Sequence, residues 1–425
     1  MRERVDVCLY VYWGYWEGRK LLRTCHSRIS TLWEETFKTA YMMSCAGLKS
    51  QHVTAIEWLA QATGASVEGL QVGSKTLTFA PTLGPAELQG RVFKIQAESS
   101  AASALLVLQA VLPFVLFSGG NEPVQLQICG GTNTSFSLTF EYLDQVLLPA
   151  LEERFGIIVA ERSLESRGWS VGQPTRGEIN LKIQPLPRGE KLRFLPPPPR
   201  SKQPADGDDS GGDLPTDVKD IDINLVLPER YHEQMRNQLF KDLTAMYPTA
   251  NINFKMVEDS RQDVRWYILV VAKCDDGAIR IAEDDLCSLP KKTNQHSTFV
   301  QSRSRDVCRA LYNQTFHDGE VDRHLEDQVI IYQAISDGYS AFRGDIPLAQ
   351  DGGGGQQNLT GAMKKLSVGE GMKMRRGKGV EPFGHGSLHA QTARWVVGEL
   401  LPAVEFYNGG ALVKGVGLNF PAGAE

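Results

Sequence analysis

The sequence predicts an α/β fold (α+β in its smaller part) made of repeated units in which a helix packs under a pair of strands. Apolar residues at helical spacing indicate helices at Gln51–Thr63, Phe140–Phe155 and His389–Leu401, and glycine or proline ends each one. Two strand-like segments follow each helix: Val67–Val72 with Lys75–Phe79, Ile157–Ala160 with Gly177–Ile183, and Val404–Tyr407 with Ala411–Val416. One pattern that recurs without sequence identity favours repeated helix-under-sheet units, with further helices at Ser99–Phe117 and Val321–Ser336.

A second pattern, between residues 188 and 298, predicts a smaller α+β domain inserted into the larger one. Its helix is expected at Pro228–Tyr247, because proline suits a first helical turn and apolar residues follow at helical spacing. Its strands are expected at Ile221–Leu227, Asn251–Val257 and Val264–Ala272. The larger domain would then be discontinuous, formed by residues 1–187 and 299–425.

Two segments have compositions that do not support a packed core. Residues 195–217 contain a proline run followed by Asp, Gly and Ser, which predicts a disordered segment. Residues 350–378 begin near a glycine run and end in basic side chains, which predicts a flexible, solvated loop.

Composition and charge exclude few functions by themselves. The chain has 425 residues, is 42% hydrophobic and carries a net charge of −5, so any polyanionic partner must meet local basic groups. Its seven cysteines are unclustered, which is typical of reduced thiols. No apolar run is long enough to cross a bilayer and the N-terminus lacks a signal-peptide core, so we expect a soluble protein of the nucleus or cytoplasm with no membrane partner.

The segment Gly386–Ala393 places His389 at the start of a helix. A neutral imidazole can attack a phosphorus atom, and the N–H groups at a helix start can hold the anion that it attacks. Histidine at a helix start is also a common cap or packing residue. The local pattern leaves both interpretations open.

The segment Val321–Gln328 offers a second set of polar side chains. Asp322 can cap the expected helix, and His324, Asp327 and Gln328 follow at i, i+3 and i+4, which would put them on one helix face. Such a face could hold a nucleobase, a ribose or Mg²⁺. A solvated helix start is the alternative.

Two glycine-containing segments complete the set of candidates. In Gly47–His52, Lys49, Gln51 and His52 could donate hydrogen bonds to phosphate oxygens, or the segment could be a plain helix cap. In Cys129–Asn133, two glycines after a strand let backbone N–H groups approach a ligand, or they form an ordinary turn.

Together and in this order, these segments resemble the RNA 3′-terminal phosphate cyclase family, as a eukaryotic, fungal-like member. The segments Leu48–His52, Val67–Ser74, Cys129–Asn133 and Leu388–Ala393 carry most of the match. The resemblance implies a large domain of three βαβαββ-type repeats with a smaller inserted domain, an architecture shared with the enolpyruvyl transferases.

The resemblance also implies a reaction and its cofactors. His389 would attack the α-phosphorus of ATP and release pyrophosphate; AMP would pass to an RNA 3′-phosphate; and the 2′-OH would close a 2′,3′-cyclic phosphate. ATP and Mg²⁺ or another divalent cation would be the cofactors, and RNA with a 3′-terminal phosphate the partner. By the same resemblance, the ATP site would comprise Gln109, His324, Leu325, Glu326, Asp327 and Gln328, and the substrate phosphates would face Gln51, His52, Arg23 and Glu17. It assigns no metal ligand and no oligomeric state.

The first 46 residues depart from the family pattern, and two other functions compete. Glu17, Gly18 and Arg23 fit, but Arg19 and Lys20 stand where the family has a glycine run. A non-catalytic relative acting in ribosomal RNA processing is expected to lack the nucleophile, so the presence of His389 favours the enzyme. An enolpyruvyl transferase needs cationic side chains around a small anion rather than a nucleophilic histidine.

Overall fold

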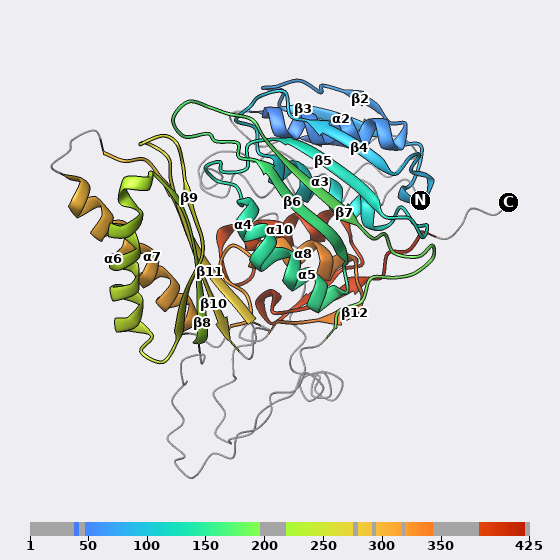
Figure 1. Cartoon of the computed structure of the whole chain (residues 1–425). Helices are drawn as coiled ribbons and strands as arrows, with labels where there is room; N and C mark the ends of the chain where they lie inside the picture. Colours follow the sequence, from blue (N-terminus) through green and yellow to red (C-terminus); the bar gives the residue numbers. More distant parts are fainter. Residues whose placement is uncertain are drawn as a thin grey trace, which may run out of the picture.

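A computed structural model of the chain describes residues 38–41, 47–195, 218–274, 279–290, 295–316, 319–342 and 382–420. It confirms the α/β class, with helices packed on mixed sheets (Figure 1). Glu17, Arg23, the segment predicted to be disordered (beyond Leu195) and the predicted 350–378 loop lie outside the described residues. Among the helices in those ranges, none is long and apolar enough to cross a membrane.

The N-terminal part of the larger domain contains one helix and a small antiparallel sheet. The helix is α2 (Ser50–Thr63), and Gly64 ends it in the left-handed conformation. The sheet has the order β1-β3-β2, formed by β1 (Lys38–Tyr41), β2 (Ser66–Glu68) and β3 (Thr76–Ala80). The strand predicted at Val67–Val72 is thus shorter than expected, because Gly69 and Gly73 take positive φ and turn the chain.

A four-stranded mixed sheet and a buried helix form the centre of the larger domain. The sheet has the order β4-β5-β7-β6, with parallel pairing only between β4 and β5; its strands are β4 (Val92–Gln96), β5 (Val124–Gly130), β6 (Val159–Ser166) and β7 (Gly177–Ile183). The helix α3 (Ala104–Leu116) is apolar on all sides except at Gln109, which is typical of a fully buried helix.

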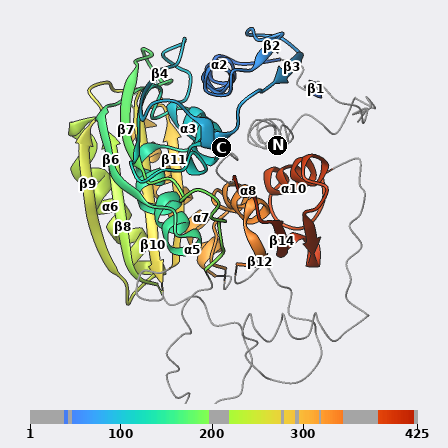
Figure 2. The ribbon, with the colours of Figure 1, turned by 90° about the vertical axis from the view of Figure 1, so that its right-hand side faces the viewer.

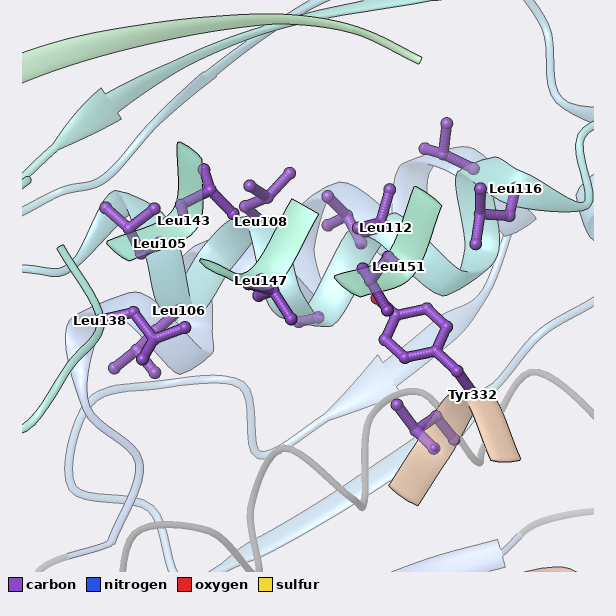
Figure 3. Packing of buried hydrophobic residues seen from close by; sticks show 14 of the residues in the cluster. Leu105, Leu106, Leu108, Leu112, Leu116, Leu138, Leu143, Leu147, Leu151 and Tyr332 are labelled. Carbon is purple, nitrogen blue, oxygen red and sulfur yellow. The ribbon is translucent and has the colours of Figure 1, made fainter. Parts of the chain in front are cut away.

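Leucines of α3 meet those of the next helical segment in the main core (Figure 3). That segment runs through α4 (Phe140–Tyr142), a π-helical turn at Leu143–Leu147 and α5 (Leu148–Phe155). It confirms the helix predicted at Phe140–Phe155. The helix predicted from Ser99 begins only at Ala104, where the Ser103 hydroxyl accepts the Leu106 N–H and caps it.

The C-terminal part of the larger domain pairs two helices over a three-stranded sheet. Helix α8 (Glu326–Ile335) packs against α10 (Leu388–Leu400), and α8 also contacts β14. The sheet has the order β12-β14-β13, with β12 (Asp337–Ser340), β13 (Glu405–Tyr407) and β14 (Leu412–Val416). In Figure 2, α8 and α10 lie beside this sheet, apart from α2 and its strands.

The inserted region forms a second sheet with its own hydrophobic core. Its order is β11-β10-β8-β9, formed by β8 (Val218–Leu227), β9 (Asn251–Asp259), β10 (Trp266–Cys274) and β11 (Ile279–Cys287). Helices α6 (His232–Met246) and α7 (His296–Thr315) pack on one face, at the left of Figure 1. Residues of the other face, such as Tyr267 and Leu269, join the main core. The boundary expected at residue 298 therefore falls inside α7, whose Val300, Val307 and Leu311 belong to the second core.

Candidate functional site

His389 is the second residue of α10, and its side chain is not used as a cap. Ser387 caps this helix, since its hydroxyl accepts the Ala390 N–H at 3.1 Å. The imidazole is 43% exposed, and its Nδ1 lies 3.9 Å from an Asp327 carboxylate oxygen. The structure therefore offers a half-exposed imidazole whose Nδ1 is turned to a carboxyl group.

Asp327 lies in the first turn of α8, and its side chain is almost fully buried, at 1% exposure. Burial raises the pKa of this carboxyl to about 8, and the neighbouring Glu326 charge adds to the rise, while the Gln328 amide and His324 oppose it. The Gln328 amide nitrogen donates to Asp327 Oδ1 at 3.1 Å. Asp327 therefore changes charge in the neutral to mildly alkaline range, directly beside His389.

A chain of polar contacts links three helices at this point. The Gln109 side-chain amide of α3 donates to the side-chain oxygen Oε1 of Gln328, Gln328 donates to Asp327, and Asp327 faces His389 of α10. Gln109 is the single polar residue of its helix and is half-buried, so this bond satisfies a group that burial would otherwise penalise. Four of the expected site residues thus lie together.

Glu326, the first residue of α8, turns to the start of α10. Its Oε2 accepts the Ser387 N–H at 3.0 Å, and its Oε1 accepts from the Arg394 guanidinium at 2.9 Å. Arg394 is buried and also donates to the His385 carbonyl oxygen. Both carboxylate oxygens of Glu326 are therefore engaged by α10 and the loop before it.

Asp322 acts as the expected cap, but α8 itself begins only at Glu326, so His324 and Leu325 lie in the capped turn before it. Asp322 Oδ1 accepts the N–H groups of His324 and Leu325, each at 2.8 Å, and holds them in a turn before the helix begins. Leu325 is 2% exposed and belongs to the main core.

The His324 ring lies edge-on to Tyr142 and close to acidic side chains of β11. Burial alone would lower its pKa, but the contact with Glu283 and the charges of Asp284 and Asp322 raise it to about 9. This imidazole therefore carries a positive charge at neutral pH, at the seam between the larger domain and the inserted sheet.

Gln51 and His52 are buried at the start of α2. The His52 Nδ1 accepts the Lys49 backbone N–H at 3.1 Å, and burial together with the Lys49 charge lowers the His52 pKa to about 4. The ring is therefore neutral and acts as a helix cap here, which is the structural alternative that the sequence left open.

The Cys129–Asn133 segment packs against the chain rather than standing open. A side chain at Gly130 would meet the Ala102 carbonyl oxygen at 2.6 Å, and Gly131 N–H donates to that same oxygen. Asn133 is fully buried. The two glycines serve a close approach of the start of α3 to the end of β5.

No group of three His, Cys, Asp or Glu side chains in the described ranges is placed to hold a metal ion. Near His389, the carboxyl groups are Asp327, whose raised pKa makes it a weak metal ligand at neutral pH, and Glu326, which Arg394 neutralises. These residues alone do not form a magnesium site.

The fold and these contacts define an α/β protein with a helix-start histidine beside a buried carboxyl group. The chain belongs to the RNA 3′-terminal phosphate cyclase family, whose model matches residues 16–350. This match includes Gln109 and the 324–328 segment, and it ends before His389.

Individual relatives agree with this assignment. RNA 3′-terminal phosphate cyclases of Drosophila melanogaster and Hyperthermus butylicus are 25% and 27% identical; each alignment covers 70% of this chain and 74% or 75% of the relative. The enzyme of that name from Methanosarcina mazei is 40% identical over 163 residues, which is 35% of this chain and 44% of the relative. The chain thus spans less than half of this relative's length.

The sequence did not point to Arg394. Its charge lies in the middle of a helix, 68 positions from its partner Glu326, so no local spacing connects them. One signal was present: glycines 384, 386, 409 and 410 flank the helix on both sides in the sequence, and side chains at these positions would overlap the atoms around Arg394.

Proposed function

We propose that this protein is an ATP-dependent RNA 3′-phosphate cyclase that works through a histidine–AMP intermediate. Family membership supports the reaction class. The contact between the His389 imidazole and the Asp327 carboxyl group supports the nucleophile and is the observation on which the proposal depends. The three-repeat architecture of the larger domain and a nuclear role in RNA processing belong to the same proposal.

The first step is transfer of AMP to the protein. The lone pair of His389 Nε2 attacks the α-phosphorus of ATP, a nitrogen–phosphorus bond forms, and the α–β phosphoanhydride bond breaks to release pyrophosphate. Attack leaves the ring positively charged. An ionised Asp327 accepts a hydrogen bond from Nδ1–H and stabilises that charge, as the carboxylate does in other nucleophile–base–acid arrangements.

Two transfers then complete the reaction. An oxygen of the RNA 3′-phosphate attacks the same phosphorus, the nitrogen–phosphorus bond breaks, and RNA carries AMP on its end. The vicinal 2′-OH attacks the terminal RNA phosphorus and releases its proton to solvent, and AMP leaves, which gives the 2′,3′-cyclic phosphate. Adenylylation supplies a good leaving group, and the 2′-OH is already adjacent, so ring closure avoids a bimolecular encounter.

The remaining site residues have supporting roles in this proposal. Gln328 holds Asp327 and is itself held by Gln109 of α3, and His324 and Leu325 remain proposed parts of the ATP site. A divalent cation such as Mg²⁺ would be held mainly by triphosphate oxygens and water, and would neutralise their charge. Gln51, Arg23 and Glu17 remain the proposed contacts to substrate phosphates, whereas the expected contact of His52 gives way to its role as a helix cap.

A non-catalytic role in ribosomal RNA processing is the competing function. Such a protein has no need for an exposed imidazole beside a carboxyl group that titrates near pH 8. Both features are present here.

The test is incubation with ATP labelled on the α-phosphate, followed by separation of protein from nucleotide. We expect an acid-labile, hydroxylamine-sensitive label that is lost in His389→Ala and retained in His232→Ala, a control histidine on α6 of the inserted region. A 3′-phosphorylated oligoribonucleotide should then be cyclised by the wild type but not by His389→Ala. Cyclisation by His389→Ala would refute the assignment.

A further inference from the structure

Glu326 and Arg394 tie the starts of α8 and α10 together. Glu326 accepts the Ser387 N–H and an Arg394 N–H, at 3.0 and 2.9 Å, while Arg394 also donates to the His385 carbonyl oxygen at 2.5 Å. Both side chains are mostly buried, at 13% and 4% exposure. An ion pair that is buried and hydrogen-bonded to backbone on both sides fixes geometry far better than an exposed pair does.

Glycines leave room for this pair. Gly386 has a φ of +82°, and a side chain there would overlap the Glu326 carboxylate; a side chain at Gly410, with a φ of +95°, would overlap the Arg394 guanidinium. The backbone conformation and the lack of a β-carbon are both required at these positions. The loop before α10 and the turn before β14 are therefore shaped around the two charged groups.

We infer that Glu326, Arg394 and Gly386 form a clamp that positions His389 against Asp327, and that Glu326 does not bind the nucleotide. The inference rests on the proposed function for its meaning in catalysis. Asp327 directly follows Glu326, and His389 lies two residues after Ser387. The clamp therefore joins the backbone segments that carry the His389 imidazole and the Asp327 carboxyl group, which lie 3.9 Å apart. Glu326 and Arg394 are positioning residues, since they act through Asp327 and His389.

The clamp also sets the charge around Asp327. The groups that face this carboxyl are Glu326 and Gln328 of α8, His324 of the preceding turn, and His389 of α10. The Glu326 charge disfavours ionisation of Asp327, and Arg394 offsets that charge at 2.9 Å. Removing the Glu326 charge and removing the Arg394 charge should therefore shift the pKa of Asp327 in opposite directions.

The first experiment follows the pH dependence of AMP transfer to the protein. Glu326→Gln keeps the shape and an acceptor for Ser387 but removes the negative charge, so the midpoint should move to lower pH, by about one unit. Arg394→Met leaves the negative charge unopposed, so the midpoint should move to higher pH. The double variant Glu326→Gln/Arg394→Met avoids an unpaired buried charge and covers the case in which the single Arg394 variant fails to fold.

The same assay separates positioning from nucleotide binding. In Glu326→Gln we expect kcat to fall about 10-fold while KM for ATP stays within about 2-fold, which is the signature of a lost transition-state interaction. A rise in KM with unchanged kcat would make Glu326 a nucleotide ligand and overturn the inference. Glu405→Gln is the matched control, because Glu405 pairs with Lys414 at 2.8 Å in the same C-terminal region and should change neither parameter.

A second measurement does not depend on activity. The protein is labelled with ¹⁵N in its histidines, and His389 is assigned by comparison with His389→Ala. At pH 9 the wild type should hold His389 with the proton on Nδ1, donated to the ionised Asp327, and Glu326→Ala or Gly386→Ala should lose this preference. An unchanged proton position in both variants would refute the clamp whatever the enzyme assay shows. Loss of the preference without any AMP labelling in the wild type would uphold the clamp and refute the proposed function.

Discussion

The histidines in the first turns of α2 and α10 differ in burial and in their contacts. In α2, His52 is the third helical residue, is buried, and accepts the Lys49 N–H. In α10, His389 is the second helical residue, is half-exposed and faces Asp327. A shift of one position at the helix start separates a structural histidine from a candidate nucleophile.

The N-cap residue explains the difference. Ser387 satisfies an N–H of the first turn of α10 with its own hydroxyl, so the histidine of that turn is not needed as a cap. Lys49 has no such oxygen, and His52 at the third position reaches back to the cap N–H. A histidine after a serine cap is thus the better candidate for chemistry.

The largest expected effect comes from removing each ring in turn. His389→Ala should lower AMP labelling by more than about 1,000-fold, since it removes the nucleophile, and should leave the melting temperature unchanged, since the ring is half-exposed. His52→Ala should keep labelling but cost about 2 kcal/mol of unfolding free energy, through a lost cap and a cavity. Denaturant unfolding measures the stability of each variant, and labelling from α-phosphate-labelled ATP measures its AMP transfer.

The two variants also test the expected phosphate contact of His52. If His52→Ala remained fully stable and labelled normally but failed to cyclise RNA, the ring would be a substrate ligand rather than a cap. The comparison between the two helix starts would then be wrong.

The second largest effect concerns Asp327, the carboxyl group that faces His389. The pKa of this carboxyl is about 8 in the folded protein and 3.8 in a model peptide, so the folded state binds the extra proton and its stability falls as pH rises from about 4 to 8. Asp327→Asn removes that dependence, and the variant should be more stable than the wild type at pH 9 but not at pH 4.

Activity should respond in the opposite sense. Wild-type AMP transfer should rise as pH passes through about 8, because the ionised Asp327 stabilises the charged ring. Asp327→Asn should lose about 100-fold and this rise together. Asp337→Asn, which disrupts a half-exposed ion pair with Lys191, is the control and should keep the wild-type profile. A wild-type rate that does not vary between pH 6 and 9 would contradict the assigned role.

The two histidines also show what sequence alone can provide. Periodicity located α2, the segment ending in α5, α6 and α10 to within a few residues, because each has a continuous apolar face. It missed α7, whose buried Val300, Val307 and Leu311 are separated by serines and arginines. A helix whose burial depends on a partner sheet has a weak pattern of its own.

The sequence predicted which segments contain the site residues, but not how their side chains contact one another. The resemblance brought His389 and Asp327 to one site, but burial of Asp327 depends on the packing of α10 over α8, which no spacing reveals. Asp322 caps the turn as predicted, but the helix itself begins only at Glu326, five residues after the predicted start. The Glu326–Arg394 pair depends on tertiary contact alone.

A smaller effect is expected from the cap itself. Ser387→Ala should cost about 1 kcal/mol of stability, and AMP transfer should fall a few-fold because the first turn that carries His389 frays. Ser103→Ala is the control: this serine caps α3 but also pairs with the Ser137 hydroxyl, so stability should fall at least as much while labelling is unaffected. Equal losses of activity in both variants would mean that the cap acts through global stability.

The smallest effect should come from Lys49→Ser, which gives α2 the cap that α10 has. The change removes the charge that helps to lower the His52 pKa, so this pKa should rise from about 4 but stay below the usual value, since burial is the larger cause. The new hydroxyl can accept the His52 N–H and should add a few tenths of a kcal/mol to about 1 kcal/mol of stability. NMR titration of the His52 ring measures the shift, with the exposed Lys75→Ser as control. If the pKa returned to about 6.5, the prediction would be wrong: either the Lys49 charge is the main cause of the low pKa, or the His52 ring has left its buried position.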